Sequence, residues 1–99
     1  MISLDQVVCR NKQTASRILA GEAIVLTPAD SRIYAFNETG SRVWELLADE
    51  LTVGQIADRI QGEFQVSQEQ AQADVVAFLQ TLLDRGVVTL SGYVEPDRR

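Results

Sequence analysis

The spacing of apolar residues changes near residue 37, and this change constrains the fold of the 99-residue chain more than any other feature. Before it, apolar residues gather in short runs rich in β-branched side chains, of which 22–27 and 32–36 are the clearest. After it, they recur at every third or fourth position, which is the period of an amphipathic helix. Strands followed by helices predict an α+β fold, because an α/β fold would alternate the two.

Two of the apolar runs are expected to form a β-hairpin. Residues 22–27 and 32–36 are separated by Pro28-Ala29-Asp30-Ser31, a sequence typical of turns because proline presets φ and aspartate bonds nearby backbone groups. A further short apolar run lies at 6–10, and 16–20 is a weaker candidate strand. Together these segments predict an N-terminal three-stranded antiparallel sheet.

Three helices are predicted to follow the sheet. The first is expected over 38–49, with Asn37 as its N-cap. The second and third open at Thr52 and Ser67, each followed three residues later by a glutamine that completes a capping box. Gly86 suits the position just beyond the end of the third helix, where glycine is favoured.

The short connection between the second and third helices is typical of a helix-turn-helix. Residues 87–94 are expected to add a short terminal strand or hairpin. The order of elements therefore predicts a winged helix-turn-helix-like α+β fold, with an N-terminal three-stranded antiparallel sheet followed by three helices. The length suits one domain, which we place at 1–95, with 96–99 as a flexible tail.

The charge distribution argues against nucleic acid as a partner. The chain has 9 Lys and Arg against 14 Asp and Glu, and residues 38–90 alone carry three basic and nine acidic side chains. Binding to nucleic acid or to an acidic membrane depends on the opposite excess. Because no apolar run approaches the length of a membrane span and no signal peptide is evident, we expect a cytoplasmic protein.

The side chains that most often carry catalysis are scarce. The chain has no histidine and one cysteine, Cys9, which excludes catalytic triads, Cys/His dyads and histidine-ligated metals. Cys9 lies in an apolar run, and we expect it to be a small buried hydrophobic residue. We therefore predict a protein that is not an enzyme and that holds no metal or cofactor.

The segment 32–36 is the most informative candidate binding site. Alternation places Arg32, Tyr34 and Phe36 on one face of the strand, and Ile33 and Ala35 on the other. At the edge of a sheet, the free N–H and C=O groups of such a strand can accept an extended peptide as an added strand. The alternative, a core hairpin whose edge is covered, remains open from the pattern alone.

Several segments of the chain together form a recognisable pattern. They are Gly21-Glu22-Ala23-Ile24-Val25-Leu26, Arg32-Ile33-Tyr34-Ala35-Phe36-Asn37-Glu38-Thr39-Gly40, Val43-Trp44-Glu45-Leu46-Leu47, Thr52-Val53 with Ile56, and Asp74-Val75 with Phe78-Leu79, Leu82-Leu83 and Gly86-Val87-Val88. These segments resemble the PqqD-like family, the relatives of pyrroloquinoline quinone biosynthesis protein D. The resemblance covers about residues 14–90. The aromatic-Asn-Glu-Thr-Gly stretch followed by Val-Trp-Glu-Leu-Leu is its most specific part.

The resemblance implies a RiPP recognition element, a small winged-helix domain that binds the leader of a ribosomally made precursor peptide. Such a domain presents the precursor to a modifying enzyme such as a radical SAM protein. It implies that the leader lies as an added strand along 32–36, in the groove that this strand forms with the third helix. The implied peptide-binding residues are Arg32, Ile33, Tyr34, Ala35, Phe36, Asp74, Val75, Phe78, Leu79 and Leu82.

Helical spacing divides the residues of the third helix into two groups. Asp74 and Phe78 are four positions apart and share a face, so they are expected to border the groove. Val75, Leu79 and Leu82 are expected to lie deeper. Asp74 is either an ordinary exposed residue or a partner for a basic group of the ligand, and the pattern leaves both readings open.

The favoured function is therefore a non-catalytic peptide chaperone, acting as a monomer or as a strand-swapped dimer. The alternative is a winged-helix protein-interaction or DNA-binding module. DNA binding is disfavoured because residues 68–85, the corresponding recognition helix, carry three acidic residues and one arginine. The precursor, the modifying enzyme and the pathway, quinone or other, are not determined by the sequence.

Overall fold

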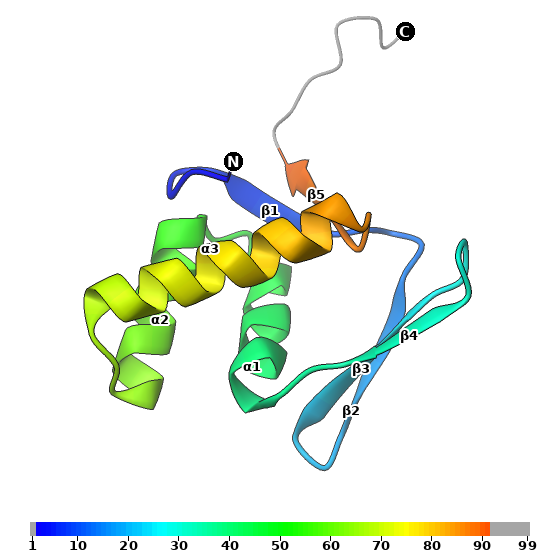
Figure 1. Cartoon of the computed structure of the whole chain (residues 1–99), viewed down its shortest axis with the longest axis horizontal. Coiled ribbons are helices and arrows are strands. Elements are labelled where there is room, and N and C mark those ends of the chain that lie inside the picture. Colours follow the sequence, from blue (N-terminus) through cyan, green and yellow to red (C-terminus); the bar gives the residue numbers. More distant parts are fainter. Residues whose placement is uncertain (1, 92–99) are drawn as a thin grey trace, which may run out of the picture.

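Two antiparallel sheets and three α-helices make up residues 2–91, the part of the chain that the computed structural model describes (Figure 1). In chain order the elements are β1 (Val7–Arg10), β2 (Ala15–Leu19), β3 (Glu22–Thr27), β4 (Arg32–Ala35), α1 (Glu38–Leu46), a 3₁₀ turn η1 (Leu47–Asp49), α2 (Val53–Phe64), α3 (Gln68–Asp84) and β5 (Val88–Ser91). The prediction of an α+β fold is confirmed, and so is the β3–β4 hairpin.

The arrangement of the strands differs from the prediction in one respect. A three-stranded antiparallel sheet is present, with order β2-β3-β4, but a further strand precedes it. That strand, β1, pairs instead with β5, from Val7 opposite Ser91 to Arg10 opposite Val88. Residues 92–94, the second arm of the expected terminal hairpin, and the expected tail 96–99 lie outside the described residues.

The helices begin where their capping residues predict. Asn37 accepts a hydrogen bond from the Gly40 amide, and Thr52 and Gln55 form a reciprocal capping box. The predicted first helix, 38–49, is too long, because α1 ends at Leu46 and η1 carries the chain onward. Glu50 then adopts a left-handed conformation, with φ of 58°, which redirects the chain toward α2.

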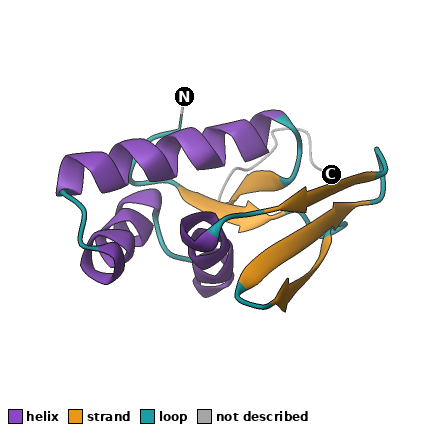
Figure 2. Cartoon of the chain, turned by 60° about the horizontal axis from the view of Figure 1, so that its bottom comes forward, coloured by secondary structure: helices purple, strands orange, loops and turns teal. Residues whose placement is uncertain are grey.

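The core lies between the inner face of the three-stranded sheet and the helices. In both views α3 lies across α1 and α2, and its C-terminal end reaches toward the strands (Figures 1 and 2). Val25 from β3, Trp44 from α1, Ile56 from α2 and Leu79 from α3 are each at most 1% exposed. Cys9, which we expected to be buried, is only half-buried.

Two arginines connect elements that are distant in sequence. Arg10 on β1 donates from Nη2 and Nε to the Trp44 carbonyl, at 2.7 and 3.2 Å, and its guanidinium lies 4.7 Å from the Trp44 ring centroid. Burial lowers the pKa of Arg10, and Glu45 partly offsets this effect. Arg42 on α1 pairs with Glu63 on α2 at 2.7 Å, and its hydrogen bonds lower the pKa of Glu63.

Candidate functional site

Strand β4 lies at an edge of the three-stranded sheet, and no described strand pairs with its outer side. The Phe36 amide donates to the Ala23 carbonyl at 3.0 Å, which marks this pair as hydrogen-bonded. Because hydrogen-bonded pairs alternate along an antiparallel ladder, the amide of Tyr34 points toward β3. The N–H and C=O groups of Ile33 and Ala35 therefore point toward the open edge.

The side chains of this strand alternate as predicted. Phe36 is buried and Tyr34 half-buried on the inner face, whereas Ile33, at 69% exposure, and Ala35 lie on the outer face. Arg32 is exposed, and its Nε lies 3.5 Å from a carboxylate oxygen of Asp30. The outward polar groups of the backbone and the inward aromatic rings thus belong to different residues of the same short strand.

Helix α3 meets the chain just beyond the end of β4. The rings of Phe36 and Phe78 meet edge to face, with their centroids 5.0 Å apart. Asp74 is exposed and Phe78 half-buried, while Val75, Leu79 and Leu82 are buried, so their predicted relative depths are correct. Leu79 and Leu82 lie in the core and have almost no surface to offer a ligand.

A cavity of about 380 Å³ opens between the start of α1 and this face of α3. It is lined by Asn37, Thr39, Gly40, Val43, Asp74, Val75, Ala77 and Phe78. A Cβ on Gly40 would lie 3.2 Å from two ring atoms of Phe78, so the absence of a side chain there allows the helix and the ring to approach closely. The cavity gathers three of the predicted site residues, Asp74, Val75 and Phe78.

The five remaining residues that line the cavity were not predicted as site residues. Asn37, Thr39, Gly40 and Val43 belong to the segments that resemble the PqqD-like family, but in the sequence they serve equally well as the first turns of a helix. Nothing in the sequence around Ala77 marks it as a residue of a binding site. The proximity of α1 to α3 is a tertiary contact, and no local pattern reveals it.

Asp74 has a neutral partner. Its Oδ1 accepts a hydrogen bond from Nε2 of Gln70 at 2.8 Å, one turn earlier on the helix. Among the ion pairs found within residues 2–91, none involves Asp74. The carboxylate therefore stands at the cavity without a described cation beside it.

The Tyr34 hydroxyl is the one side-chain polar atom in the described part of the chain that is buried without a hydrogen-bond partner. Its ring centroid lies 6.3 Å from that of Phe36, so the tyrosine extends the aromatic cluster along the inner face of β4. The ring contributes apolar packing beside Phe36, and the hydroxyl forms no hydrogen bond within residues 2–91.

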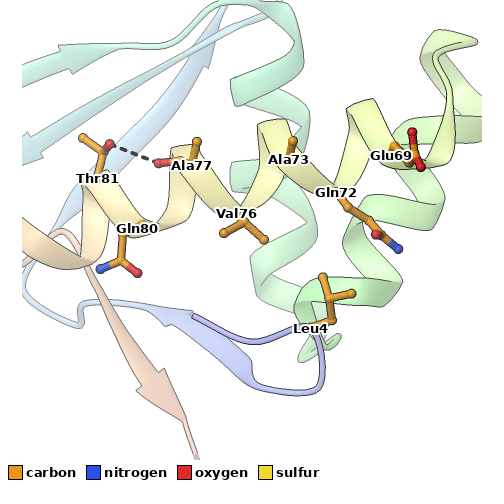
Figure 3. Close-up of a pocket in the computed structure, with 8 residues that line it drawn as sticks. All are labelled: Leu4, Glu69, Gln72, Ala73, Val76, Ala77, Gln80 and Thr81. Carbon is orange, nitrogen blue, oxygen red and sulfur yellow. Dashed lines mark hydrogen bonds between the residues drawn. The ribbon is translucent and has the colours of Figure 1, made fainter. Parts of the chain in front are cut away.

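A larger cavity of about 600 Å³ lies on another face of α3 (Figure 3). It is lined by Leu4, Glu69, Gln72, Ala73, Val76, Ala77, Gln80 and Thr81. Figure 3 shows Leu4, from the N-terminal segment, across from the helix. None of the predicted site residues lines this cavity, which shares only Ala77 with the cavity that Asp74 and Phe78 line.

Within residues 2–91, no three His, Cys, Asp or Glu side chains lie close enough together to hold a metal ion. No helix in the same part of the chain has the length and apolar character needed to cross a membrane.

Known structures with the same fold include proteins bound to leader peptides. TbiB1 in complex with the TbiA(beta) leader peptide superposes with a TM-score of 0.77 at 24% identity, over 88% of this chain and 99% of that chain. A lasso peptide synthetase B1 complexed with its leader peptide gives 0.76 at 16% identity, over 84% and 98% of the two chains. The PqqD part of Methylobacterium extorquens PqqCD, a stand-alone RiPP recognition element, gives 0.75 at 20% identity, over 90% and 95%.

The sequence itself matches a family and a curated relative. A PqqA binding protein from Bradyrhizobium diazoefficiens is 32% identical over 66 residues, which are 67% of this chain and 62% of that protein. The chain thus spans less than two thirds of the length of that relative. Residues 22–88 match the family model described as coenzyme PQQ synthesis protein D (PqqD). The chain therefore belongs to the PqqD family, as its strand and helix motifs predict.

Proposed function

We propose that this protein binds the leader of a ribosomally made precursor peptide as an added strand along β4. The observation that carries the proposal is the open edge, where the backbone groups of Ile33 and Ala35 point away from β3. The cavity on α3 begins at Asn37, two residues beyond the end of β4. A relative named for binding PqqA and two similar folds solved with leader peptides support the same reading.

In strand addition, backbone hydrogen bonds supply most of the affinity and side-chain contacts supply the selectivity. The outward N–H and C=O groups of β4 bond to the peptide backbone whatever its sequence, while the groove between β4 and α3 selects side chains. An extended peptide must be ordered when it binds, which offsets part of the interaction energy. We expect affinities in the micromolar to submicromolar range, roughly −8 to −9 kcal/mol.

The proposed peptide-binding residues are those of the sequence prediction, with a division of roles. The strand 32–36 supplies backbone groups and the rings of Tyr34 and Phe36, and α3 supplies Asp74 and Phe78 at the groove. Val75 reaches the floor of the cavity, and Leu79 and Leu82 support it. The protein acts without catalysis and without a cofactor, and hands the bound precursor to a modifying enzyme such as a radical SAM protein.

The winged helix-turn-helix description is part of the same proposal. Residues 65–67 connect α2 to α3, and β5, which follows α3, pairs with β1 in a two-stranded ribbon that would serve as the wing. Within α3, three acidic residues and no arginine or lysine are present, which argues against contact with phosphates. The chemistry of this helix suits a protein or peptide partner.

An amide-shift titration tests the proposal. The ¹⁵N-labelled protein is titrated with synthetic leader peptides encoded by the small open reading frames beside its gene. Saturable shifts confined to 32–36 and 74–82 are expected for a cognate leader. Shifts confined to α2, or no shift with any of these peptides, would contradict leader binding at β4.

Replacement of Ala35 by proline gives the sharper version of this test. Because the Ala35 amide points toward the open edge, Ala35→Pro removes an outward donor while the bonds to β3 remain. We expect the variant to keep its fold, measured by circular dichroism, and to lose at least tenfold in leader affinity, measured by isothermal titration calorimetry.

Proline at Ile18 is the matched control. By the same alternation, the Ile18 amide points toward the opposite open edge of the sheet, on β2. Ile18→Pro should therefore leave leader affinity within about twofold. Equal losses in the two variants would show that the peptide does not select the β4 edge.

A further inference from the structure

We propose that the cavity at the end of β4 receives a lysine or arginine side chain of the bound peptide, and that the Asp74 carboxylate is the partner of its cationic group. This inference rests on the proposed function and adds the chemical class of the side chain that this part of the groove selects. Three observations carry it: the shape and lining of the cavity, the charge at its mouth, and its position relative to the open edge.

The lining suits a long side chain with an apolar stem. The cavity of about 380 Å³ has an apolar floor made by Val43 and Val75, each 1% exposed, and by the ring of Phe78. Lysine and arginine bury their methylene stems against such surfaces while keeping the charged group near solvent. A cation over an aromatic ring such as Phe78 gains a further attraction.

The charge at the mouth is negative and lacks a described counterion. Gln70 satisfies one oxygen of Asp74 with a neutral amide, and α3 carries no lysine or arginine. The arginine of α1, Arg42, is already engaged by Glu45 and Glu63. A cation from the peptide would therefore meet a carboxylate that has no described counterion, and a charge-assisted hydrogen bond is about twice as strong as a neutral one.

The position of the cavity fits the register of an added strand. The outward backbone groups of β4 end at Ala35, and Asn37, two residues further along, already lines the cavity. Side chains of a strand alternate between its faces and each residue adds about 3.3 Å of length. A peptide residue just beyond the one paired with Ala35 can therefore direct its side chain inward, toward Asp74 and Phe78.

The test is a double-mutant cycle with a leader that binds in the titration above. Each lysine or arginine of that peptide is replaced in turn by norleucine, which keeps the stem and removes the charge. Affinities of the wild-type protein and of Asp74→Asn are measured by isothermal titration calorimetry. We expect one peptide position to lose about tenfold with the wild type and less than twofold with Asp74→Asn, a coupling of about 1.0 to 1.4 kcal/mol.

Asp84→Asn is the matched control, because Asp84 lies on the same helix and accepts a hydrogen bond from Gln80, four residues earlier, at 2.9 Å. It does not line the cavity. Asp84→Asn should leave affinity within about twofold, so a loss confined to Asp74→Asn cannot come from the shared Gln–Asp contact or from net charge.

The outcomes separate the two proposals. The basic-residue pocket would be overturned if the free-energy losses of the peptide and protein substitutions were additive in every cycle. It would also be overturned if Asp74→Asn left affinity unchanged. Either result would leave leader binding intact. A leader that binds at β4 without any lysine or arginine would do the same. If no leader binds the wild-type protein, both the proposal of strand addition at β4 and the proposal of a basic-residue pocket are contradicted.

Discussion

Tyr34 is a residue whose environment the sequence predicts only in part. Strand alternation correctly places its ring on the inner face, beside Phe36. The pattern cannot show whether the hydroxyl finds a partner, because that depends on helices distant in sequence. In residues 2–91 it finds none, and a buried polar group without a hydrogen bond is destabilising.

Removal of this hydroxyl should therefore cost little. We expect Tyr34→Phe to leave the free energy of unfolding unchanged or to raise it by up to about 1 kcal/mol, because no described hydrogen bond is lost. Urea denaturation followed by tryptophan fluorescence measures the change. Tyr34→Leu, which removes ring packing, is the control and should be destabilising. A loss of more than 1 kcal/mol in Tyr34→Phe would show that the hydroxyl has a partner.

At the scale of elements, helix starts were predictable and one helix end was not. Asn37, Thr52 and Ser67 cap helices through contacts within three residues, so the sequence alone reveals them. Helix α1 ends at Leu46 and passes into η1, and the buried Leu47 continues the apolar pattern beyond the helix. The spacing of apolar residues predicts which positions are buried. It does not predict whether the backbone hydrogen bonds are those of an α-helix or of a 3₁₀ turn.

The capping box of α2 offers a test at this scale. Thr52→Ala removes the oxygen that accepts from the Gln55 amide at 3.1 Å, and we expect a loss of about 1 kcal/mol in unfolding free energy. Thr81→Ala is the matched control, since the Thr81 hydroxyl bonds only to the Ala77 carbonyl within an exposed helical turn. It should be neutral or slightly stabilising. Equal effects in thermal unfolding would contradict a capping role for Thr52.

At the scale of the whole molecule, the β1–β5 ribbon brings residues near the two ends of the described chain side by side. Val8 and Val88 are at most 1% exposed in that ribbon, so it belongs to the core. Arg10 extends the connection from β1 to α1 through the Trp44 carbonyl and ring. The ribbon and the helices are therefore expected to unfold together.

Arg10→Lys tests this connection. A lysine cannot reproduce the two hydrogen bonds and the stacking of a planar guanidinium, so we expect a loss of about 1–2 kcal/mol in unfolding free energy. Arg17→Lys is the control, because Arg17 is exposed and forms none of the ion pairs found within residues 2–91. It should change stability by less than about 0.5 kcal/mol. Unchanged denaturation in both variants would contradict the connection.

The sequence by itself determined the α+β class, the β3–β4 hairpin, the helix starts and the family, because these depend on residues close together in the chain. Part of the candidate site followed from the same local patterns, namely the faces of β4 and the depth of residues on α3. Only the tertiary structure decided that β1 pairs with β5, that β4 keeps an open edge, and that Gly40 and Asp74 border one cavity. Those features depend on which segments distant in sequence pack together. The free energy of that packing is distributed over many side chains, so no local pattern predicts it.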